Sequence, residues 1–151
     1  MTSPIPERYF ELFRERIALL TTLADALTVA RLEVISFDVA GLERRIADQQ
    51  RLCTQIRAVD SELVGIQRQC ASALDAGAAK PGMAAPDTQR LRDLTVRLSA
   101  VQSTVKQLNA AHQALLLRSR RTANALLNSY RSFAETYSNP AAAHAIAGER
   151  A

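Results

Sequence analysis

The sequence feature that most limits the fold of this chain is the spacing of its apolar residues, which recur in alternating steps of three and four over long stretches. Such spacing places apolar side chains on one face of an α-helix, whereas a half-buried strand requires a period of two. Three stretches show it, and the sequence therefore predicts an all-α fold. The last stretch opens with six such positions in succession: Leu91, Leu94, Leu98, Val101, Val105 and Leu108.

The three stretches predict three helices, at about residues 4–35, 38–75 and 88–137. The intervening segment 76–87 contains two glycines and two prolines, which interrupt a helix. Long amphipathic helices with short connections hide their apolar faces by folding back on one another. The predicted architecture is an antiparallel three-helix bundle, or coiled-coil hairpin with a long C-terminal helix, formed by residues 1–137. Residues 138–151 are predicted to be a flexible tail.

Helix ends are predicted from residues that accept hydrogen bonds from free backbone N–H groups. Ser3 is expected to cap the first helix, with the next two prolines in its first turn. Asp38 is expected to cap the second helix, and Asp87 or Thr88 the third. Gly65 lies inside the second helix, where it costs about 1 kcal/mol relative to Ala. Simple tolerance of this glycine and the close approach of a neighbouring helix both remain open.

The predicted helices differ in length, and the difference suggests a binding surface. The third helix exceeds the second by about a dozen residues at 1.5 Å per residue, so the overhang covers roughly Ala125–Tyr137. Contiguous apolar surface without a partner in its own chain usually marks a site for another protein. Cover by Phe37 and dimerisation are the alternatives. The exposed apolar residues expected there are Leu126, Leu127, Tyr130, Phe133 and Tyr137.

Metal and disulfide chemistry find little support in the sequence. Cys53 and Cys70 are 17 residues apart in one predicted helix, about 25 Å, too far to form a disulfide. With only two histidines, a Cys/His metal site has almost no ligands. His112 falls on the apolar face of the third helix and is expected to be buried and hydrogen-bonded. No cofactor or metal is predicted.

Other functional classes are disfavoured by missing motifs. The chain contains no glycine-rich phosphate loop, no GxSxG or HExxH motif and no paired set of histidine and carboxylates, so it is not expected to be an enzyme. It also lacks an apolar run long enough to cross a bilayer and a secretion signal at its start. A cytoplasmic protein is expected.

Basic charge is concentrated in the C-terminal half. Residues 1–76 carry nine arginines against eleven acidic residues, whereas residues 88–137 carry eight basic residues against two acidic ones. This pattern raises nucleic-acid binding through phosphate contacts. The basic residues spread over several faces, however, and no aromatic residue lies among them to stack on a base. An acidic protein partner accounts for the same charge more simply.

Several segments resemble the FlgN-type flagellar export chaperones. Residues 38–42 read Asp-x-x-x-Leu at the entry to the second helix, residues 108–119 read Leu-Asn-x-x-His-x-x-Leu-Leu-x-x-Ser, and residues 137–140 read Tyr-Ser-Asn-Pro. His112 stands where a second Asn is usual in that family, and Ser138 follows Tyr137 where many members have Gly.

This resemblance implies a cytoplasmic chaperone that keeps the hook–filament junction proteins FlgK and FlgL unassembled and delivers them to the flagellar type III export apparatus. It also implies that the C-terminal helix accepts an amphipathic helix of the client. A structural coiled-coil adaptor, another secretion chaperone and, less favoured, a basic nucleic-acid-binding protein are the alternatives, and homodimerisation is open. The docking face that the resemblance implies consists of Leu115, Leu116, Ala123, Leu126, Leu127, Tyr130 and Phe133, flanked by Arg120, Arg121 and Arg131. Tyr137 of the overhang completes the predicted partner-binding residues.

Overall fold

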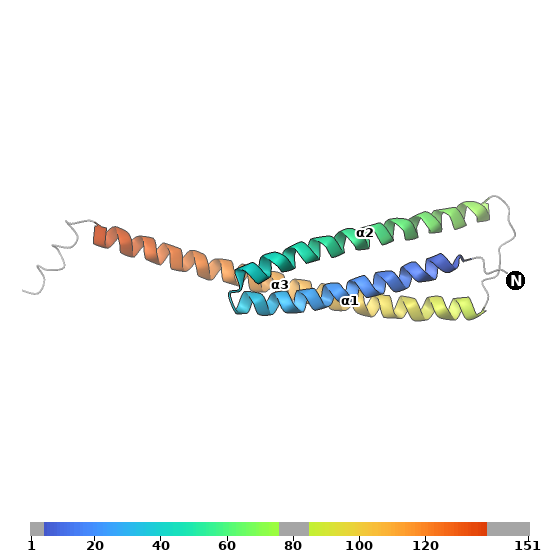
Figure 1. Ribbon diagram of the computed structural model, residues 1–151, viewed down its shortest axis with the longest axis horizontal. Helices are drawn as coiled ribbons and strands as arrows, with labels where there is room; N and C mark the ends of the chain where they lie inside the picture. Colours follow the sequence, from blue (N-terminus) through green and yellow to red (C-terminus); the bar gives the residue numbers. More distant parts are fainter. Residues whose placement is uncertain (1–4, 76–84, 139–151) are drawn as a thin grey trace, which may run out of the picture. The chain divides into compact units, whose positions relative to one another are not determined.

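The protein is built from helices throughout the part of the chain that its computed structural model describes, namely the backbone of residues 5–75 and 85–138 and the side chains of residues 5–71 and 86–135. No strand occurs within those ranges, which confirms the predicted all-α class. The helices are α1 (Glu7–Ile35), α2 (Val39–Asp75) and α3 (Ala85–Ser138), shown in Figure 1.

The chain divides into two units, Met1–His112 and Gln113–Ala151. In the first, here called the bundle unit, α2 runs back along α1, and the part of α3 that belongs to this unit packs on the hairpin (Figure 1). The predicted three-helix bundle is thus confirmed. In the second unit the structure describes the remainder of α3, residues 113–138, here called the C-terminal segment.

Apolar side chains from all three helices form the core of the bundle unit. One cluster joins Leu23 and Leu27 of α1 to Leu52 of α2, and Val105 and Leu108 of α3 pack against it. Burying a Leu or Val side chain of this kind contributes about 1.5–3 kcal/mol. The heptad spacing that predicted the helices therefore also supplies the surface that holds them together.

A second cluster lies nearer the start of α1. Leu12 is completely buried there against Val59 and Leu63 of α2. Phe10 is buried as well, and the guanidinium of Arg90 from α3 lies 4.3 Å from the centre of its ring. Phe10 is therefore part of the core at this end of the bundle unit.

Ion pairs between the helices fix their register. Arg8 donates to both carboxylate oxygens of Glu62, at 2.8 and 3.1 Å. Arg90 likewise donates to both oxygens of Glu7, at 2.7 and 3.1 Å. Hydrogen bonding from these arginines lowers the pKa of Glu7 and of Glu62. Because all four side chains are exposed, the pairs specify alignment more than they add stability.

The α1–α2 turn closes with a left-handed residue. Phe37 has φ 56°; its N–H donates to the carbonyl of Val34, and the Asp38 N–H donates to that of Glu33. This pairing is the Schellman motif, in which glycine is the usual left-handed residue. The predicted cap by Asp38 is confirmed, since its Oδ1 accepts a 2.9 Å hydrogen bond from the Gly41 N–H.

The other two helix starts differ from expectation. The N-cap of α1 is Pro6, which provides no side-chain hydrogen bond, so Pro6 precedes the first turn instead of lying in it; Ser3 and Pro4 lie outside the described residues. α3 begins at Ala85, and Asp87 therefore lies within its first turn. A carboxylate at this position interacts favourably with the positive end of the helix dipole. Proline fits both the position before a helix and its first turn. The sequence alone therefore left open whether Pro6 precedes α1 or lies in its first turn.

Candidate partner-binding face

The C-terminal segment presents large apolar side chains to solvent. Leu126, Tyr130 and Phe133 expose 67%, 72% and 62% of their surface, values typical of surface positions and unusual for side chains of this size and character. Leu127 is also exposed. The described residues of the predicted overhang therefore find little cover within the chain. The side chain of Tyr137 lies outside the described residues.

Helical periodicity gathers these residues on one face. At 100° per residue, Leu115, Leu126, Tyr130 and Phe133 fall within about 60° of one another around the helix axis. Leu116, Ala123 and Leu127 extend this face to about 120°. Of the seven, only Leu115 is half-buried and the others are exposed. We call these seven residues the apolar stripe.

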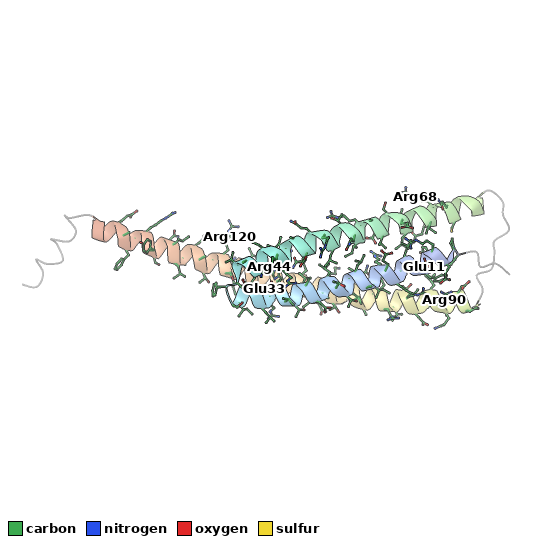
Figure 2. The ribbon with its side chains drawn as sticks, viewed as in Figure 1. Glu11, Glu33, Arg44, Arg68, Arg90 and Arg120 are labelled. Atoms are coloured by element: carbon green, nitrogen blue, oxygen red, sulfur yellow. The ribbon has the colours of Figure 1, made fainter. Side chains whose placement is uncertain are left out.

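The C-terminal segment is also basic. Its described side chains include four arginines and one acidic residue, Glu135. By the same periodicity Arg120 and Arg131 adjoin the Leu127 edge of the apolar stripe, whereas Arg121 falls on the opposite side of the helix. Figure 2 shows Arg120 projecting outward from α3. The stripe is thus bordered by positive charge along one edge.

A shallow hollow lies beside this basic edge. It is lined by Gln113, Leu116, Leu117 and Arg120 and measures about 420 Å³. The heptad pattern missed Leu117, because this residue lies about 100° beyond Leu116 and off the stripe. Its only signal in the sequence is the run of three leucines at 115–117. The hollow has the size and lining to accept one apolar side chain next to a cation.

His112 is buried, and one of its two ring nitrogens lacks the hydrogen bond that was expected. The residue is 6% exposed, and its Nδ1 has no hydrogen-bond partner among the described residues. Burial lowers the pKa of the imidazole, since the charged form loses hydration. Burial is thus confirmed, whereas the prediction of a hydrogen-bonded His112 is wrong for Nδ1.

A second group of exposed apolar residues lies in the bundle unit. Leu32, Ile35, Phe37 and Val39 surround the α1–α2 turn, and Phe37 is 84% exposed. The sequence alone predicted no role for Leu32, Ile35 or Val39.

Metal-binding and membrane-spanning features are absent from the described residues, 5–75 and 85–138. There, no group of three or more His, Cys, Asp or Glu side chains is placed to hold a metal ion, and no helix is both long and apolar enough to cross a membrane. Cys53 and Cys70 are half-buried free thiols. Comparison with protein-family models, with curated proteins and with solved structures yields no match to this chain.

Proposed function

We propose that this chain is a cytoplasmic export chaperone of the FlgN type, which binds hook–filament junction proteins resembling FlgK and FlgL through the C-terminal segment and prevents their premature assembly. The observation that carries the proposal is the exposure of Leu126, Leu127, Tyr130 and Phe133 on one helix face. Aromatic and leucine side chains at helical spacing are the usual anchors of a groove or helix partner.

The chemistry of the face favours an amphipathic, acidic client helix. The apolar stripe accepts the apolar face of such a helix, and Arg120 and Arg131 along its edge attract carboxylates. The resemblance in residues 108–119 places the implied client site on the same helix. The residue pattern at 108–119 and the exposure of the apolar stripe support the proposal independently. The pattern depends on which residues occur in the sequence, whereas the exposure depends on how the helix packs.

A triple substitution of Leu127, Tyr130 and Phe133 by Ala tests the proposal. Binding of a purified junction protein of the FlgK or FlgL type, followed by isothermal titration calorimetry, is expected to be lost, because truncating each central anchor costs about 2 kcal/mol or more. Circular dichroism is expected to stay helical, since none of the three side chains is buried.

A matched control removes the same kind of surface elsewhere. Substitution of Leu32, Ile35 and Val39 by Ala deletes three exposed apolar side chains of the bundle unit, and client binding is expected to persist. Equal loss in both triple variants, or binding that survives the first, would refute the docking face.

Salt dependence separates this function from nucleic-acid binding. A nucleic-acid complex loses affinity steeply and linearly on a log–log plot against salt because counterions are released. A client held by an apolar stripe with two flanking arginines is expected to show a shallow dependence. Tight, steeply salt-dependent binding of a labelled oligonucleotide, without binding of a junction protein, would favour the nucleic-acid alternative.

A further inference from the structure

The outer side of α2 carries a second hollow, within the bundle unit and separate from the apolar stripe. It measures about 390 Å³ and opens to solvent. Figure 2 shows one of its residues, Arg68, projecting from the outer side of α2. The hollow is lined by Arg57, Asp60, Ser61, Val64, Gly65 and Arg68.

Gly65 leaves open space on the surface of α2, and no packing contact among the described residues accounts for a glycine at this position. A Cβ added to Gly65 would meet no described atom within 4 Å, so no neighbouring helix requires glycine here. The residue nevertheless lowers the helix propensity of α2 relative to alanine. Beside it, Val64 exposes 41% of its surface. The hollow therefore has an apolar floor next to a backbone that a partner can approach closely.

The charges around the hollow are positive once pairing is considered. Asp60 is engaged by Arg16, whose Nε lies 2.8 Å from Asp60 Oδ1. No ion pair is found for Arg57 or Arg68 within the described part of the chain. The two arginines are eleven residues apart, close to three helical turns, and so lie on the same side of α2 about 16 Å from each other.

We infer that this hollow docks an acidic amphipathic helix of another protein. One apolar side chain of the partner enters the hollow over Val64 and Gly65, and carboxylates about three turns apart reach Arg57 and Arg68. Charge complementarity selects this occupant, because two unpaired cations flank an apolar centre. Nucleic acid is disfavoured, since its backbone calls for a continuous cationic track.

A designed peptide tests the inference. The probe is a fluorescein-labelled, alanine-based helical peptide of about 18 residues, with two glutamates eleven residues apart and two leucines midway between them. A control peptide carries lysine in place of each glutamate. Fluorescence anisotropy with the full-length protein is expected to show saturable binding of the acidic peptide and none of the lysine peptide.

Substitutions inside and outside the hollow distinguish specific binding at this place from nonspecific binding elsewhere on the protein. Gly65→Leu fills the hollow and raises helix propensity, so the fold is kept while peptide affinity is expected to fall at least about tenfold. Ala47→Leu adds the same side chain at an exposed position of α2 outside the hollow and is expected to leave affinity unchanged. Arg57→Glu and Arg68→Glu are expected to weaken binding in the same way as Gly65→Leu.

The result is independent of the proposed chaperone function. The measurement is repeated in the Leu127, Tyr130 and Phe133 triple variant, which lacks the anchors of the apolar stripe. This variant is expected to retain the component of peptide binding that Gly65→Leu weakens, because its substitutions lie in the C-terminal segment. The inference is overturned if the unmodified protein does not bind the acidic peptide at concentrations up to about 1 mM. A dissociation constant of 1 mM corresponds to a binding free energy near −4 kcal/mol. Equal binding to Gly65→Leu, equal binding of the lysine peptide, or self-association of the protein that Gly65→Leu abolishes in sedimentation experiments also overturns the inference.

Discussion

Among the residues that the structure describes, Phe37 is the non-glycine residue with a positive φ. A non-glycine residue in the left-handed region is strained by about 1–2 kcal/mol, and the aromatic ring recovers little of this because it is 84% exposed. The sequence predicted the turn and the Asp38 cap. It could not predict that Phe37, two residues after the last residue of α1, would take the position at which glycine is expected.

We expect Phe37→Gly to raise the free energy of unfolding by about 1 kcal/mol, because relief of strain outweighs the added freedom of glycine in the unfolded chain. Urea denaturation followed by circular dichroism measures the change. Phe37→Ala keeps a Cβ and is expected to bring no such gain. Destabilisation by the glycine variant would show that the ring makes contacts important for the fold.

His112 illustrates the limit of sequence reasoning at a single position. The apolar spacing of the third helix predicted that the side chain is buried. A hydrogen bond, however, depends on which groups of the other helices face the imidazole, and the spacing of residues along one helix does not contain that information. Because burial lowers the pKa of His112 in the folded state, stability is fully present above the unfolded value of about 6.5. It is lost as pH falls from there toward the folded value.

We expect His112→Leu to raise stability at pH 7 by about 1–2 kcal/mol, since a buried polar atom without a partner is removed. The same substitution is expected to reduce the loss of stability between pH 7 and pH 5. Urea denaturation at several pH values measures both effects. His112→Asn cannot titrate but stays polar, so the pH dependence is expected to shrink without the gain; an unchanged pH profile in both variants would contradict the assignment.

At the scale of elements, apolar spacing predicted the number, order and approximate bounds of the helices because heptads report local geometry directly. The ends were less predictable where proline fits more than one position, as at Pro6. Contacts such as Arg90 with Glu7 join residues 83 apart in sequence and leave no local signal. For the candidate site, spacing predicted the apolar stripe but missed Leu117 and the hollow at Gly65, which depend on three-dimensional surface shape.

The C-terminal segment is predicted to be the least protected helical element of the free protein. Its side chains contribute little burial, and a helix without tertiary packing is marginal in water. Hydrogen–deuterium exchange is expected to be faster at the amides of residues 113–135 than at those of Leu20–Leu27 in the α1 core. Equal protection of both regions would mean that a second copy or another element covers the apolar stripe.

At the scale of the whole molecule, the two units differ in charge and in packing. The bundle unit pairs many of its charges and buries apolar residues of three helices, whereas the C-terminal segment carries four arginines and exposed leucine and aromatic side chains. A stable scaffold and a sparsely packed, basic, apolar helix suit a protein that holds another chain temporarily. The central claim of the proposed function is that the bundle unit serves as a stable scaffold and the C-terminal segment binds the client.

Hydrogen–deuterium exchange of the full-length protein, with and without a purified junction protein of the FlgK or FlgL type, tests that claim most directly. Binding is predicted to slow exchange at residues 113–135, which include the apolar stripe, and to leave the core of the bundle unit unchanged. Protection confined to the bundle unit, or no protection at a client concentration that saturates binding, would contradict the account.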